Sequence, residues 1–167
     1  MVKQDSSVLI ENVKTDSKSS GTKDKMTKKK ISLLLKKWTD ILGLEKWKIN
    51  LVYEDCEDES NYMEIIRSID YHRAKLIVPT WVIGEKEAPK NLIMGSNLNE
   101  TFWEESLVHE LLHLVVTPIS TVVRLDIEYQ LHRDVFSLLE KTMIHAEERV
   151  VDNLAVALVR AFQEKNG

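Results

Sequence analysis

The feature that most constrains this chain is the segment His109-Glu110-Leu111-Leu112-His113, which has the form H-E-x-x-H within an apolar run. In an α-helix, residues four positions apart lie on one face, so both imidazoles can bind one metal ion with Glu110 beside it. Neutral imidazole nitrogens bind Zn²⁺ at about 2.0–2.1 Å, and bound zinc lowers the pKa of a water ligand to about 7. The motif predicts a zinc site with Glu110 as general base; the alternative is a core helix without a metal.

A catalytic zinc usually has three protein ligands and one open position, so the two histidines need a third residue. The candidates are Glu147 and Glu148, which precede apolar residues at helical spacing. A carboxylate drawn toward an apolar face is unfavourable unless it is paired or bound to a metal. Asp152 favours Glu148, because an acid four residues later can accept the free N–H of a metal-bound histidine. The alternative is that both glutamates are first-turn residues that the helix macrodipole favours.

The two motifs together resemble those of the gluzincin clan of zinc metallopeptidases, in which a glutamate in E-x-x-x-D on the next helix completes the H-E-x-x-H site. The matching segments are His109-Glu110-Leu111-Leu112-His113 and Glu148-Arg149-Val150-Val151-Asp152, followed by the apolar and small pair Leu154-Ala155. The short chain looks more like the minigluzincins and related small phage or bacterial domains than like the larger enzymes.

This resemblance implies that His109, His113 and Glu148 are zinc ligands, that Glu110 is the general base and that Asp152 orients a ligand histidine. It also implies the fold class, which is α+β. We expect a small antiparallel or mixed sheet packed on the H-E-x-x-H helix and followed by C-terminal helices, with a sheet edge that binds a peptide backbone by strand addition.

Several other residues are weaker candidates for the site. Tyr129, His132 and His145 lie in predicted helical sequence, where a lone histidine is more often a surface group. His145 is the best of them as a transition-state stabiliser because it precedes Glu148 by one helical turn. His72 falls in a predicted turn. The large aromatic residues are predicted to form core rather than a substrate platform: Trp38, Trp47, Trp81 and Trp103.

Composition limits the class of protein. With 167 residues and 43% hydrophobic content, the chain can form one domain with a core. Residues 1–30 hold eight lysines against four acidic residues, so the formal charge of −4 leaves −8 on residues 31–167, which argues against a nucleic-acid partner. The lone Cys56 allows no internal disulfide, and no signal sequence or run of ~20 apolar residues is evident. We therefore expect a cytoplasmic protein without a membrane partner.

Residues 1–27 are rich in Ser, Lys, Asp and Thr and are predicted to be a disordered tail whose removal leaves the fold intact, with one domain over residues 28–167. Periodicity predicts a helix over residues 31–42 that ends at Gly43, and a strand over residues 47–53. Residues 62–69 and 74–78 are predicted to pair as antiparallel strands around a short turn.

The form Thr101-x-x-Glu104 predicts a capping box at the start of the metal helix, and Pro118 is expected just past its end. The chain is again predicted to be helical from Ser120 to Ile144. This stretch offers several apolar side chains for packing: Val123, Ile127, Leu131, Phe136, Leu138, Leu139 and Met143.

Two classes of function fit these features. The first is a single-domain zinc endopeptidase that hydrolyses a peptide or protein substrate with metal-activated water and Glu110 as base. The second is a non-catalytic zinc-binding or helical interaction protein, such as a phage-type accessory protein. No cysteine lies near the motif to help complete a closed structural zinc site, which favours the first class.

Overall fold

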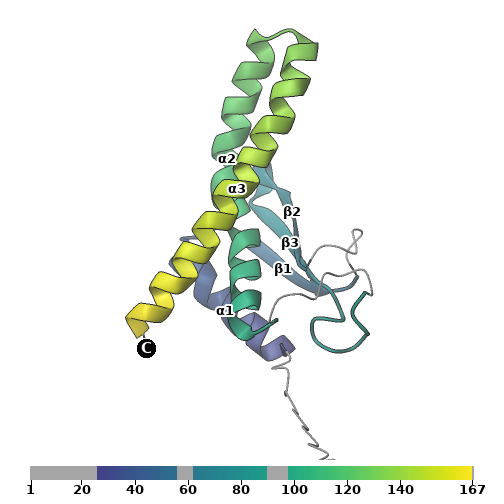
Figure 1. Cartoon of the computed structure of the whole chain (residues 1–167), viewed down its shortest axis with the longest axis vertical. Helices are drawn as coiled ribbons and strands as arrows, with labels where there is room; N and C mark the ends of the chain where they lie inside the picture. Colours follow the sequence, from purple (N-terminus) through teal and green to yellow (C-terminus); the bar gives the residue numbers. More distant parts are fainter. Residues whose placement is uncertain (1–25, 56–61, 90–97, 167) are drawn as a thin grey trace, which may run out of the picture.

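The computed structural model describes residues 26–55, 62–89 and 98–166, which form an α+β fold as predicted (Figure 1). A three-stranded mixed sheet lies beside two long helices and a shorter one. The elements follow in the order α1 (Lys28–Ile41), β1 (Lys48–Tyr53), β2 (Glu64–Ser68), a 3₁₀ turn (Ile69–Tyr71), β3 (Arg73–Val78), α2 (Glu100–Gln130) and α3 (Arg133–Asn166).

The sheet has the strand order β1-β3-β2, which leaves β2 at one edge of the described sheet. Strands β2 and β3 pair antiparallel, as predicted, and His72 closes the turn between them in the left-handed conformation, with φ 46°. Strand β1 pairs with β3 in parallel, with Lys48 opposite Arg73. Successive side chains of a strand alternate between faces, so Met63, Ile65 and Arg67 share one side of the β2 segment, and Met63 and Ile65 are buried in the core beneath α2.

One apolar core joins the sheet to all three helices. Helix α1 contributes Ile31 and Trp38, and Gly43 ends it in the left-handed conformation with φ 66°, which glycine adopts without strain. Helix α2 contributes Leu107 and Leu111. The tryptophans are part of this packing, as predicted: Trp38 and Trp103 are buried, and Trp47 and Trp81 pack against the core while partly buried.

The expected boundary between tail and domain is wrong by two residues. The side chain of Met26 is only 2% exposed and belongs to the core. Thr27 is the N-cap of α1, and its hydroxyl accepts a hydrogen bond from the backbone N–H of Lys30. Residues 1–25 lie outside the described residues. Composition marked the whole segment as polar, and one methionine within a polar run gives no periodic signal.

Replacing Met26 with alanine in the full chain should therefore lower the free energy of unfolding by roughly 2–4 kcal/mol, because it removes a buried side chain from a packed core. The exposed neighbour Lys29 provides the matched control, since Lys29→Ala should change stability by less than about 0.5 kcal/mol. Urea denaturation of both variants measures the difference. Equal midpoints for Met26→Ala and the wild type would show that this residue does not support the core.

Two predictions about the ends of α2 are wrong. The helix is capped by Asn99, whose side chain accepts from the N–H of Phe102, and not by a box formed by Thr101 and Glu104. Glu104 instead is buried and binds Trp38 and Lys37 of α1. Pro118 lies within α2, which continues for three more turns to Gln130 with α3 packed along it.

The second half of α2 and the first half of α3 extend past the sheet as a two-helix hairpin (Figure 1). The predicted helical stretch from Ser120 to Ile144 is interrupted where the two helices meet, at Leu131 and His132. Phe136 is buried, but Leu138 is 74% exposed, and most of the apolar side chains that this stretch offers for packing are exposed.

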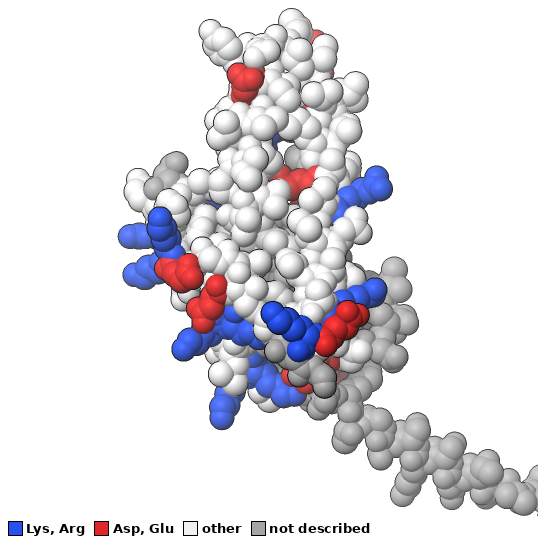
Figure 2. Space-filling view, turned by 90° about the vertical axis from the view of Figure 1, so that its left-hand side faces the viewer, with Lys and Arg blue, Asp and Glu red and all other residues white. Residues whose placement is uncertain are grey.

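Figure 2 shows few charged side chains on the visible face of this hairpin. By length and hydropathy alone, α2 meets a criterion for a membrane-crossing helix that buried core helices also meet. The N-terminal half of α2, with Leu107, Val108, Leu111 and Leu114, is the centre of the core described above.

Candidate metal centre

The H-E-x-x-H motif lies in the middle of α2, where His109 and His113 are on one face of the helix and one turn apart. Glu148 and Asp152 lie within α3, which packs along α2. Glu147 and Glu148 are far from the first turn of α3, so the alternative that they are first-turn residues is wrong. The structure brings His109, His113 and Glu148 together as a group that can hold a metal ion.

The three ligand atoms form a nearly equilateral triangle. The Nε2 atoms of His109 and His113 are 3.2 Å apart, and Glu148 Oε2 is 3.4 Å from the first and 3.5 Å from the second. Ligands placed tetrahedrally about 2.0–2.1 Å from a zinc ion are separated by about 3.3–3.4 Å. The triangle therefore has the dimensions of three corners of a zinc tetrahedron, and the donor set of two imidazoles and one carboxylate suits the same ion.

Both imidazoles have a carboxylate on the side away from the triangle. Asp152 Oδ1 lies 2.8 Å from His109 Nδ1, which places the proton on Nδ1 and leaves Nε2 as the metal-facing lone pair. His113 Nδ1 is 3.5 Å from Glu147 Oε1, a distance longer than that of a formed hydrogen bond. Burial lowers the pKa of His113, which favours the neutral form that binds metals.

Glu147 is oriented by the neighbouring helix rather than by the triangle. The Thr117 hydroxyl donates to Glu147 Oε1 at 2.9 Å. Burial of the carboxylate opposes ionisation, but hydrogen bonds from Ser120 and Thr117 outweigh it and lower the pKa of Glu147. The sequence left Glu147 open as a possible ligand, and the structure places it behind His113.

Glu110 lies beside the triangle and is half-buried. Burial raises the pKa of Glu110 to about 8, an effect that a hydrogen bond with the backbone of Ile65 opposes and the nearby charge of Glu148 increases. A divalent cation held by the triangle would act in the opposite direction and favour the carboxylate. Glu110 is therefore a proton-accepting group whose ionisation depends on the occupation of the adjacent site.

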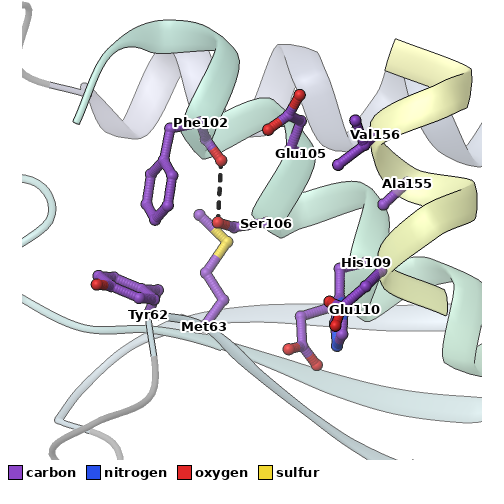
Figure 3. Close-up of a pocket in the computed structure, with 10 residues that line it drawn as sticks. Tyr62, Met63, Phe102, Glu105, Ser106, His109, Glu110, Ala155 and Val156 are labelled. Atoms are coloured by element: carbon purple, nitrogen blue, oxygen red, sulfur yellow. Dashed lines mark hydrogen bonds and ion pairs between the residues drawn. The ribbon is translucent and has the colours of Figure 1, made fainter. Parts of the chain in front are cut away.

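Two hollows flank the triangle. The larger, of about 400 Å³, has His109 and Glu110 at one end and is walled by Tyr62, Met63 and Phe102 (Figure 3). The smaller, of about 250 Å³, adjoins Glu148 and contains Arg67, whose charge also acts on Glu110 and His113.

Sequence reasoning missed Arg67. Met63, Ile65 and Arg67 are two positions apart in a predicted strand, and alternate residues of a strand share a face. This spacing could have indicated that Arg67 faces the metal helix.

The remaining candidates lie away from the triangle. His145 is exposed on α3, lines neither hollow and contacts none of the three ligands within the described residues. His132 pairs with the exposed Asp134 at the hairpin end, at 3.7 Å, and Tyr129 is 93% exposed there. His72 packs edge-on against Trp47, with ring centroids 5.4 Å apart. The predicted role of His145 therefore has no structural support.

Comparison with known proteins adds nothing to this geometry: no protein-family model, curated protein or solved structure matches the chain significantly. Only the geometry of the site therefore indicates the function.

Proposed function

We propose that this chain is a single-domain zinc-dependent peptidase with a zincin-like arrangement of its metal helix and sheet. The observation that carries the proposal is the triangle of His109, His113 and Glu148, whose edges of 3.2–3.5 Å fit zinc, together with the half-buried Glu110 beside it. The three ligands leave a fourth position for water or substrate, as catalytic zinc sites do.

The edge strand supports a peptide as the substrate. Strand β2 has β3 on one side and no neighbouring strand on the other within the described residues, and it lies against α2 near the metal site. An extended peptide can pair with such an edge through backbone hydrogen bonds. Met63 and Arg67, on the same side of this segment, then lie beside the larger and the smaller hollow.

A bound zinc ion would supply Lewis acidity toward the scissile carbonyl and lower the pKa of a nearby water molecule. The carboxylate of Glu110 accepts a proton from that water as its oxygen bonds to the carbonyl carbon. The C–N bond then breaks, and Glu110 returns the proton to the leaving nitrogen. Asp152 keeps the proton of His109 on Nδ1, so that Nε2 stays available as a ligand atom.

A non-catalytic zinc protein is the second class that the sequence allowed. A structural zinc usually has four protein ligands, whereas the group found among the described residues has three members. Cys56 lies outside the described residues. The three-ligand group and the adjoining hollow of about 400 Å³ favour the peptidase.

Metal analysis of purified variants tests the proposal. The wild type should bind one zinc ion per chain, and His109→Ala and His113→Ala should lose it. Glu148→Ala should lower zinc affinity by more than about 100-fold, whereas Glu147→Ala, which removes only an outer partner of His113, should lower it by roughly 10–100-fold.

The paired glutamate variants serve as each other's control, because both remove one carboxylate from adjacent positions of α3. Retention of stoichiometric zinc in both histidine variants would refute the metal site. An equal loss of affinity in Glu147→Ala and Glu148→Ala would refute the assignment of the third ligand.

A further inference from the structure

The larger hollow combines an apolar wall with acidic side chains. The ring of Tyr62 packs edge-on against Phe102, with centroids 4.9 Å apart. Met63 from the sheet side, with Ala155 and Val156 from α3, completes the apolar surface. The lining also includes the carboxylates of Glu105, Glu110 and Asp152. Among the described residues it contains neither lysine nor arginine.

Of these three carboxylates, Glu105 is the one that has no role in the proposed reaction. Asp152 contacts His109, and Glu110 is the proposed base. Glu105 lies one turn before His109 on α2, is half-buried, and makes no hydrogen bond or ion pair with the described part of the chain. Figure 3 draws Glu105 on the α2 side of the hollow and Val156 on the α3 side. A half-buried acid without a partner is complemented by a cation that enters the hollow.

We propose that this hollow receives the side chain of a lysine or arginine residue adjacent to the scissile bond, an inference that rests on the proposed peptidase function. The methylene stem of such a side chain covers the apolar wall, and its cationic head reaches Glu105. A neutral aliphatic side chain would fill the same wall but leave Glu105 unpaired. An acidic side chain would be repelled, so the same residue also discriminates against wrong substrates.

Two small probes test this inference without relying on turnover. Lysine hydroxamate and norleucine hydroxamate carry the same metal-binding group and share a four-carbon stem, and they differ in the terminal ammonium. Calorimetry on the zinc-loaded chain should show lysine hydroxamate binding roughly tenfold more tightly, the size expected of one partly exposed charge pair. Glu105→Gln should make the two affinities equal, and Glu105→Lys should reverse their order.

Glu128→Gln is the matched control, because it removes one exposed carboxylate from the far end of the same helix and should keep the lysine preference. Equal affinities in the wild type, or a lysine preference that survives in Glu105→Gln, would overturn the inference while leaving the metal site in place. Failure of both probes to bind the zinc-loaded protein would instead count against the proposed function itself, and against this inference with it.

Discussion

Replacing Glu110 with glutamine should lower peptide hydrolysis by about 10²–10⁴-fold while zinc content and fold stay at the wild-type level. The amide is nearly the same size as the carboxylate but cannot accept a proton from water. Since Glu110 is not one of the three residues of the triangle, its replacement should leave the zinc stoichiometry unchanged at saturating metal. The loss should appear in kcat with little change in KM, because the missing interaction belongs to the chemical step.

Steady-state or stopped-flow assays on any peptide that the wild type cleaves, combined with metal analysis, measure this effect. Glu128→Gln on the exposed end of α2 should retain wild-type turnover and controls for the loss of one charge from this helix. Undiminished cleavage by Glu110→Gln would exclude Glu110 as the general base, whatever the metal content.

Replacing Glu104 with alanine should lower the free energy of unfolding by about 2–4 kcal/mol. Glu104 Oε1 accepts hydrogen bonds from Lys37 Nζ and Trp38 Nε1, both at 2.7 Å, and Oε2 contacts Gln163 of α3 at 3.4 Å. The alanine variant leaves the indole N–H of a buried tryptophan without a partner. Lys37 is about one-third exposed and can regain water, which keeps the expected loss below that of a fully buried pair.

Chemical denaturation of Glu104→Ala and Glu104→Gln measures this contribution. The glutamine variant keeps an oxygen that can accept from Trp38 and loses only the charge, so it should lie between the alanine variant and the wild type. A midpoint for Glu104→Ala within error of the wild type would show that this contact between helices adds no stability.

Features set by local periodicity could be predicted from the sequence. The spacing of Ile31 and Trp38 gave helix α1, and the alternation from Trp47 to Tyr53 gave strand β1. The pairing of β2 with β3 followed from two β-prone segments around a short turn. Each of these depends on residues close together in the chain, where backbone geometry alone fixes which side chains share a face.

Features set by tertiary contacts could not be predicted in this way. The partners of Glu104 in α1, Lys37 and Trp38, lie more than sixty positions away in the sequence, so the local pattern that predicted Glu104 as a capping residue was misleading. Pro118 gave a local stop signal that packing of α2 against α3 overrides. The parallel pairing of β1 with β3 and the orientation of Arg67 depend in the same way on how distant segments meet.

For the site, the sequence motifs indicated the three residues that lie together in the structure. They did not indicate the distances between the ligand atoms. The spacing of His109 and His113, and the position of Asp152 four residues after Glu148, favoured three residues that lie together in the structure. The role expected for His145 depended only on its distance from Glu148 along the helix. Its exposed position shows that one turn of spacing places a residue near a site without directing its side chain into it.

The ligand atoms come from two helices that run side by side as a hairpin beyond the sheet, two from α2 and one from α3. An ion held by all three would therefore act as a cross-link between segments that are distant in sequence, and it would bind the folded chain far better than the unfolded one. By mass action, each tenfold rise in free zinc above the dissociation constant adds about 1.4 kcal/mol to the stability of the folded state. The supply of zinc would then change the stability of the folded chain as well as the activity proposed for it.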